Sequence, residues 1–190
     1  LNKNEINLPN HEIISYFNRF EFDFGIIIRL STRKYLFLTH MEKLFNHNYF
    51  MELAIREAVK AFDSGEVPVG AVVVYENKVI AKGYNQVETL KDPTAHAEMI
   101  AITAAASVLD SKRLTETILY STLEPCPMCA GAILHSRFKL VVFGAMDVKW
   151  GACSTLYHLL QDDKFNVKIP VISGVKEIES ESLLKSFFQK

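Results

Sequence analysis

The sequence predicts an α/β sandwich, in which a central sheet is covered by helices on both faces. Segments with apolar residues at helical spacing alternate along the chain with short β-like runs, which is the pattern of this fold class. A hydrophobic content of 49% over 190 residues is enough to build the core of one such domain. The absence of internal repeats and low-complexity tracts favours a single domain with an appendage.

The first predicted elements are a helix and a hairpin. Apolar side chains recur at helical spacing at Met51, Ile55, Ala58 and Phe62. Because Ser64 and Gly65 end this run, we expect a helix over 48–63. Two β-like runs follow at 69–75 and 78–84, and Glu76-Asn77 between them indicates a hairpin.

The rest of the chain continues the alternation. Pro93-Thr94 is typical of a helix start, and the alanine-rich segment after it predicts a helix to about residue 109. The remaining expected elements are a strand at 117–123, a helix that begins in the proline-cysteine stretch near 125–129, a strand at 140–143, a short helix near 154–161, a strand near 168–172 and a helix near 177–188. Residues 1–45 have no sustained period, so we interpret them as an N-terminal extension.

Composition limits the binding partners and the cellular compartment that we expect for the protein. A formal charge of −1 and a pI near 6.7 give no global basic signal, so contact with nucleic acid must come from a local patch or an oligomer. No apolar run is long enough to span a membrane, and acidic residues near the start argue against a signal or transit peptide. Three cysteines, two of them in a C-x-x-C, favour a reducing compartment, so we expect a cytoplasmic protein.

The C-x-x-C motif is formed by Cys126 and Cys129, with Pro125 and Pro127 beside Cys126. It could serve as a redox pair, as two metal ligands or as two buried thiols that meet by chance. A shuffled chain of this composition contains P-C-x-x-C only about once in a thousand times, so chance is a poor explanation. The redox interpretation is weakened by a histidine upstream that could complete a metal site.

That histidine is His96, which forms an H-x-E with Glu98. Residues two apart in a helix point in directions that differ by about 200°, so the pair can serve one site only at a helix entrance. Pro93-Thr94 predicts that both lie in the first turn of a helix. A second H-x-E at His40 has no such context, and we interpret it as part of the extension.

His96, Cys126 and Cys129 are a typical set of zinc ligands. Three protein ligands leave one position of a tetrahedral zinc open for water, which is the mark of a catalytic site. Glu98 is then placed to take a proton from that water and return it to a substrate. The alternative is a closed structural site in which Cys153 is the fourth ligand, although an isolated cysteine is more often a small buried hydrophobe.

The motifs resemble those of the bacterial tRNA-specific adenosine deaminases, within the cytidine and deoxycytidylate deaminase superfamily. The H-A-E followed by P-C-x-x-C is the general signature of zinc-dependent nucleobase deaminases. More specific stretches match in order and spacing over roughly 48–188: VPVGAVVV from Val67, GYN from Gly83, DPTAHAE from Asp92, TLEPCPMCAGA from Thr122 and HSR from His135.

The resemblance implies a cytidine-deaminase-like fold, a three-layer α/β/α sandwich with a five-stranded mixed sheet. It also implies one zinc per subunit, a homodimer, and a tRNA anticodon stem-loop whose wobble adenosine becomes inosine. Asn85 corresponds to a residue that contacts the flipped base, or else simply satisfies the backbone of its loop. Asp147 corresponds to a residue beside the target ribose, or else is a solvated loop carboxylate.

The ends of the chain depart from the family pattern. Phe187-Phe188 resembles a C-terminal aromatic pair, but Gln189-Lys190 replaces the usual basic tail. We therefore expect either weaker RNA affinity or RNA contacts from residues such as Arg137, Lys139 and Lys149. Family members usually start near Met41. We therefore expect either a native start at Met41 or a dispensable extension, with the zinc-dependent deaminase domain at 46–190. A deaminase of free cytidine, cytosine or guanine, and a non-catalytic zinc module that binds RNA or protein, remain alternatives.

Overall fold

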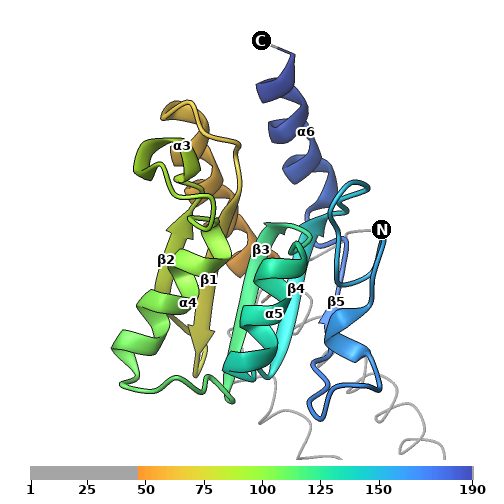
Figure 1. Cartoon of the computed structure of the whole chain (residues 1–190). Coiled ribbons are helices and arrows are strands. Elements are labelled where there is room, and N and C mark those ends of the chain that lie inside the picture. Colours follow the sequence, from red (N-terminus) through yellow and green to blue (C-terminus); the bar gives the residue numbers. More distant parts are fainter. Residues whose placement is uncertain (1–46, 190) are drawn as a thin grey trace, which may run out of the picture. The chain divides into compact units, whose positions relative to one another are not determined.

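A five-stranded mixed sheet forms the centre of the computed structural model, which describes residues 47–189 (Figure 1). The strands are β1 (Gly70–Tyr75), β2 (Lys78–Tyr84), β3 (Thr117–Leu123), β4 (Leu140–Ala145) and β5 (Val171–Ile172). Their order across the sheet is β2-β1-β3-β4-β5. β1 pairs antiparallel with β2 and β3, whereas β3, β4 and β5 run parallel.

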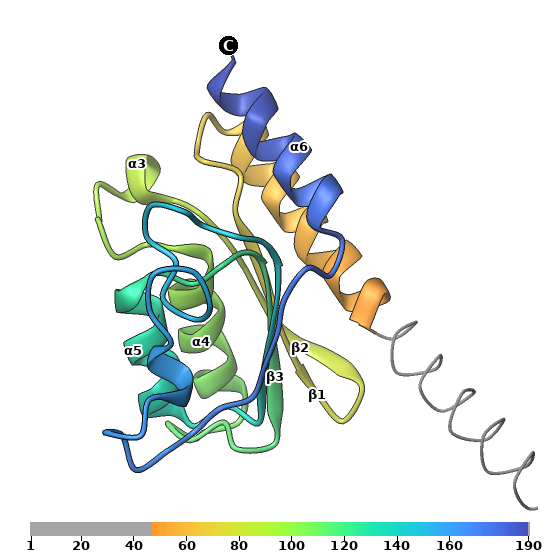
Figure 2. The ribbon, with the colours of Figure 1, turned by 90° about the vertical axis from the view of Figure 1, so that its right-hand side faces the viewer.

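Helices cover both faces of this sheet. One face carries the helix that ends at residue 63 and helix α6 (Glu177–Phe188), which lie side by side (Figure 2). Phe62 and Phe187 join them through an edge contact with ring centroids 6.0 Å apart. The other face carries α4 (Ala97–Val108) and α5 (Pro127–Ser136). The expected three-layer α/β/α sandwich is therefore confirmed.

Successive side chains of the strands alternate between two apolar clusters, one on each face of the sheet. Val73, Leu119 and Phe143 belong to the apolar cluster beneath α4 and α5. Val72, Tyr120 and Val142, on the opposite side of the same strands, pack in the cluster that includes Met51 and Ala54 of the first helix. Since successive side chains of a strand point to opposite faces, these three buried strands are apolar on both sides.

The β1–β2 hairpin turns where the sequence predicts it. Glu76 and Asn77 have φ angles of 46° and 63°. Two successive residues with positive φ form the tight turn whose twist matches that of the flanking strands. Further along β2, a Cβ atom at Gly83 would lie only 2.3 Å from the carbonyl oxygen of Ala97. Glycine therefore lets β2 approach the first turn of α4 closely.

Helix α4 begins later than the sequence indicates. Asp92 accepts hydrogen bonds from the backbone N–H and the hydroxyl of Thr94, so Pro93-Thr94 lies in a separate turn. The helix proper starts at Ala97, with His96 as its N-cap. The prediction that His96 lies in the first turn was therefore wrong by one position, but His96 and Glu98 do lie at a helix entrance.

Other differences concern short elements. The helix expected near 154–161 is reduced to a 3-10 helix at Leu159–Gln161, so the prediction was wrong for residues 154–158. Strand β5 is only two residues long, and the strand is limited by Pro170, which has no N–H to donate. A four-residue helix α3 (Val87–Leu90) was not predicted, and β4 extends two residues beyond the expected end.

The described residues belong to the compact unit Leu44–Lys190. Within them, no helix has the length and apolar character that crossing a bilayer requires. The predictions for residues 1–45, including those for His40 and Met41, lie outside the described part of the chain.

Candidate active site

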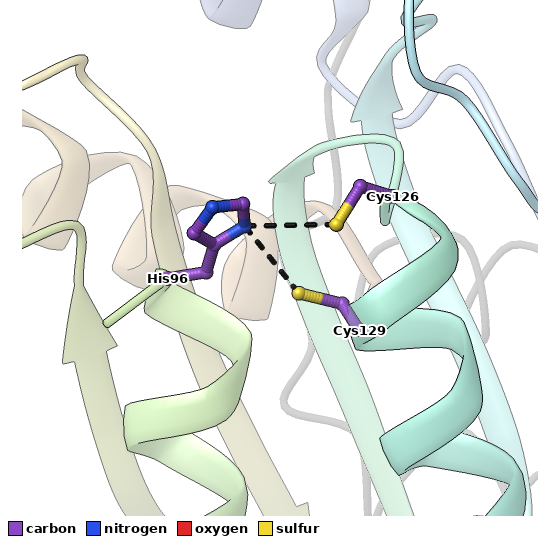
Figure 3. Close-up of side chains that lie close together, drawn as sticks. All are labelled: His96, Cys126 and Cys129. Atoms are coloured by element: carbon purple, nitrogen blue, oxygen red, sulfur yellow. Dashed lines mark hydrogen bonds between the residues drawn. The ribbon is translucent and has the colours of Figure 1, made fainter. Parts of the chain in front are cut away.

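Two helix N-termini bring the predicted metal ligands together. His96 is the N-cap of α4 and Cys126 is the N-cap of α5, both with extended backbone conformations. Pro127 opens α5, and Cys129 lies fully buried in its first turn. Figure 3 shows the imidazole of His96 facing the two sulfur atoms across the gap between the helices.

The distances fit a tetrahedral zinc. His96 Nδ1 lies 3.7 Å from Cys126 Sγ and 3.6 Å from Cys129 Sγ. Because zinc–sulfur and zinc–nitrogen bonds of about 2.3 and 2.05 Å meet at roughly 109°, a bound zinc places such ligand atoms about 3.6 Å apart. One histidine nitrogen and two thiolates are also a donor set that zinc prefers. The geometry and the chemistry of these residues therefore fit the metal.

Cys153 does not join this group. Within residues 47–189, the cluster suited to a metal ion consists of His96, Cys126 and Cys129, whose ligand atoms all lie within 4.8 Å of one another. Cys153 is buried, and its thiol lies 3.9 Å from the carbonyl oxygen of Pro125. Burial raises the pKa of this thiol. The closed four-ligand site is not formed, and Cys153 behaves as a small buried residue.

The two clustered thiols differ in acidity. A hydrogen bond from Cys129, reinforced by His96, lowers the pKa of Cys126 to about 4 despite the opposing effect of burial. The same hydrogen bond and burial raise the pKa of Cys129. A cation among the three ligands would stabilise both thiolates.

Glu98 lies beside the ligands but is not one of them. Its side chain is only 3% exposed, and it interacts electrostatically with His96 and Cys126. Burial raises its pKa to about 7. A carboxyl group with a pKa near neutrality can both accept and donate a proton at ordinary pH, as a general acid–base requires.

The family of the chain follows from this arrangement and from comparison with known proteins. Residues 45–145 match the model of the cytidine and deoxycytidylate deaminase zinc-binding region. The chain belongs to the cytidine and deoxycytidylate deaminase family. The match confirms the family resemblance and the expected zinc cofactor.

Individual deaminases are similar over most of this chain. The tRNA-specific adenosine deaminase of Bacillus subtilis (strain 168) is 49% identical over 141 residues, which cover 74% of this chain and 88% of the relative. A solved structure from work on A-to-I editing by tRNA:A34 deaminases is 41% identical with a TM-score of 0.69, covering 71% of this chain and 98% of that one. A guanine deaminase from Bacillus subtilis is 35% identical with a TM-score of 0.51, covering 61% of this chain and 85% of that one.

In this deaminase-family chain, Asn85 lies close to the metal ligands. It directly follows β2, and the next residue, Gln86, donates its N–H to the carbonyl oxygen of Ala95, which precedes His96. The Asn85 side chain is 7% exposed, and its Nδ2 donates to Glu66 Oε2 at 3.4 Å. This bond orients the amide.

Asp147 has a structural role that sequence reasoning only partly anticipated. Its Oδ1 accepts the backbone N–H groups of Lys149 and Trp150 at 2.9 and 3.1 Å. One carboxylate oxygen thus stabilises the loop after β4, whereas the alternative interpretation supposed a solvated loop carboxylate. The side chain remains partly exposed.

Sequence patterns did not identify two buried carboxylates near the site, those of Glu66 and Glu124. Glu66 accepts the backbone N–H groups of Glu88 and Thr89, at 3.1 and 2.6 Å, in addition to Asn85. Glu124 accepts five hydrogen bonds, described below. Glu66 lies two residues before a proline and shortly before β1, in GEVPVG, whereas Glu124 lies directly before a proline and directly after β3, in LEPC. An acid this close to a proline and an apolar strand is the signal that could have identified both.

Proposed function

We propose that this chain deaminates adenosine to inosine at the wobble position of tRNA anticodons, in a zinc-dependent hydrolysis. The observation that carries the chemistry is the cluster of His96, Cys126 and Cys129 with the buried Glu98 beside it. The substrate class is supported by the tRNA-specific adenosine deaminase that is 49% identical to this chain.

The roles of the residues follow from their positions. His96, Cys126 and Cys129 hold zinc, which when bound supplies a Lewis acid that makes water nucleophilic near neutral pH. Glu98 takes a proton from the attacking water and delivers it to N1 of adenine as oxygen bonds to C6. It then carries the remaining hydroxyl proton to the amino group, the C6–N6 bond breaks, and ammonia leaves. The product has a C6 carbonyl and a proton on N1, which is inosine.

Asn85 and Asp147 are proposed to contact the substrate. The amide of Asn85 is oriented by Glu66, so its Oδ1 can accept a hydrogen bond from the extruded base. Asp147 retains one carboxylate oxygen that could accept a ribose hydroxyl, since its Oδ1 is already used by the loop. Both residues therefore also make a local structural bond that fixes their side chains.

The anticodon stem is proposed to bind through local basic residues. Lys112, Arg113, His135 and Arg137 line a pocket of about 450 Å³ at the C-terminal end of α5. Within residues 47–189, neither arginine makes an ion pair, whereas Lys139 pairs with Glu116 at 2.9 Å. The unpaired arginines are therefore better suited to RNA phosphates than Lys139.

The remaining parts of the proposal concern assembly. The deaminase domain is 46–190, the extension at 1–45 is either not native or dispensable, and the protein acts in the cytoplasm as a homodimer. Support for a dimer comes from large apolar side chains that are exposed after β4, namely Met146, Val148, Trp150, Leu156, Tyr157 and Phe165.

A deaminase of free guanine is the second candidate, because a guanine deaminase is 35% identical over 61% of this chain. The test compares three substrates with the same zinc-loaded protein: an anticodon stem-loop with adenosine at the wobble position, free guanine and free cytidine. Inosine formation on the stem-loop, with no turnover of the free compounds, is expected. Turnover of guanine or cytidine alone would overturn the assignment, and no turnover at all would favour a non-catalytic zinc module.

A further inference from the structure

Glu124 is the most heavily hydrogen-bonded side chain around the site. Its Oε1 accepts three consecutive backbone N–H groups, from Cys153, Ser154 and Thr155, at 3.0, 2.6 and 2.9 Å. Its Oε2 accepts the N–H of Asp147 at 3.1 Å and the hydroxyl of Thr155. Because a carboxylate offers about four lone-pair sites, these five donors fill its capacity to accept hydrogen bonds. The side chain is 1% exposed.

The bonds of Glu124 reach both ends of one segment, 147–155. Asp147 opens this segment and Thr155 closes it, so one carboxylate fixes its two ends together. Between them, a Cβ atom at Gly151 would lie 2.4 Å from Glu124 Oε2 and 2.5 Å from the carbonyl oxygen of Asp147. The segment therefore wraps tightly around the carboxylate, and only glycine fits at its closest approach.

The same segment is tied to the zinc-ligand helix. Ala152 donates its N–H to the carbonyl oxygen of Pro125 at 3.0 Å, and Pro125 directly precedes Cys126. Glu124 itself follows β3 and donates its own N–H to Ala145, the last residue of β4. The carboxylate thus stands between the start of α5, which carries the cysteines, and the segment that carries Asp147.

We propose that Glu124 is a positioning residue, which holds segment 147–155 in the shape that presents Asp147 to the RNA substrate. This inference rests on the proposed function. The five hydrogen bonds that Glu124 accepts come from segment 147–155, four from backbone N–H groups and one from the Thr155 hydroxyl, and it acts through that segment. Its loss should weaken substrate binding more than it slows the chemical step, because none of the hydrogen bonds that Glu124 accepts comes from His96, Cys126, Cys129 or Glu98.

The carboxylate is required because every group that faces it is a donor. A glutamine at this position has the same size, but its NH₂ group would face either Asp147 and Thr155 or the three consecutive N–H groups. Donors would then face donors in a buried place. Glu124→Gln is therefore a nearly isosteric change that releases one part of the segment while keeping the volume of the core.

The experiment measures kcat, KM, zinc content and amide hydrogen exchange for wild type and Glu124→Gln on the anticodon stem-loop. KM should rise about tenfold with kcat changed less than about threefold, since leaving buried donors unpaired costs roughly one such factor. Zinc content should stay unchanged, and the amides of Cys153, Ser154 and Thr155 should exchange faster. The matched control is Glu57→Gln, which alters a buried carboxylate on the opposite face of the sheet, paired with Lys60 at 2.7 Å. It should leave KM unchanged.

An unchanged KM in Glu124→Gln would overturn the inference, even if the melting temperature fell. If that variant does not fold, Thr155→Val removes the hydroxyl donor alone and should raise KM in the same direction by a smaller factor. An unchanged KM in Thr155→Val would then contradict the proposal. Failure of the wild type to convert the stem-loop would instead refute the proposed function, so the two failures are distinguishable.

Discussion

The Nδ1 atom of His96 lies 3.6 Å from the Sγ atom of Cys129, although the two residues belong to different helices. His96 caps α4 and Cys129 lies in the first turn of α5, so the N-termini of both helices point at one place. Their positive ends favour thiolates over thiols there. The distance is that of two ligands of one tetrahedral zinc, and it leads to the first prediction.

Removing either cysteine of the cluster should abolish zinc binding. Cys126→Ala leaves two ligands, which are too few to hold a catalytic zinc, so both metal content and deamination should be lost. Metal analysis of the purified variants measures this. The matched control is Cys153→Ala, which changes a cysteine outside the cluster and should keep one zinc per chain. Loss of metal in the control would restore the closed four-ligand site.

Ionisation of Glu66 should make the free energy of unfolding depend on pH in the acidic range. Burial opposes ionisation of Glu66, but the N–H groups of Thr89 and Glu88 outweigh it and hold the pKa below its usual value. A carboxyl with a depressed folded-state pKa stabilises the protein above its unfolded pKa of about 4.5, and this contribution is lost as pH falls through the folded value. Glu66→Gln should thus cost about 1–3 kcal/mol of unfolding free energy near neutrality.

Chemical denaturation of both proteins between pH 7 and pH 3 measures the effect of Glu66. The difference in unfolding free energy between wild type and Glu66→Gln should be constant near neutrality and shrink in acid. A difference that is independent of pH would show that Glu66 does not titrate between the folded and unfolded states as its hydrogen bonds require.

The basic pocket should contribute salt-dependent RNA affinity. Arg113→Ala and Arg137→Ala should each weaken stem-loop binding and lower the slope of log Kd against log salt by about 1, if each contacts one phosphate. Binding titrations at several salt concentrations measure this. Lys185→Ala is the control, because Lys185 pairs with Glu181 at 2.5 Å on α6, away from the pocket. Equal slopes in all three variants would place the RNA elsewhere.

The N-terminal extension should be dispensable. A chain that begins at residue 46 retains every proposed zinc ligand, Glu98 and the complete sheet. We expect its zinc content and kcat/KM on the stem-loop to equal those of the full chain. A drop of tenfold or more in kcat/KM with unchanged zinc would assign residues 1–45 a role in RNA binding or catalysis.

The main elements and the metal site were predictable because their causes are local in sequence. Helical spacing predicted the first helix, Glu76-Asn77 predicted the hairpin turn, and the prolines beside Cys126 predicted a helix start. The turn that Asp92 stabilises is also local in sequence. Pro93 is compatible with such a turn as well as with a helix start, so its presence did not show which of the two forms.

The parts that the sequence did not reveal depend on distant bonds. Helix α3 forms where Glu66 captures N–H groups more than twenty positions further along the chain. The N–H groups of Cys153, Ser154 and Thr155 likewise bond to Glu124, which lies about thirty positions earlier. Periodicity describes which face of an element is apolar, but it carries no information about which buried carboxylate will bind its backbone.

The role of Glu98 tests the central claim most directly. Wild type and Glu98→Gln should be compared for zinc content and for inosine formation in single turnovers on the wobble-adenosine stem-loop. The account predicts that Glu98→Gln keeps its zinc and binds the RNA, but loses deamination by at least about a hundredfold, because no group is left to transfer the proton. Normal turnover by Glu98→Gln, with zinc and RNA bound, would contradict the account.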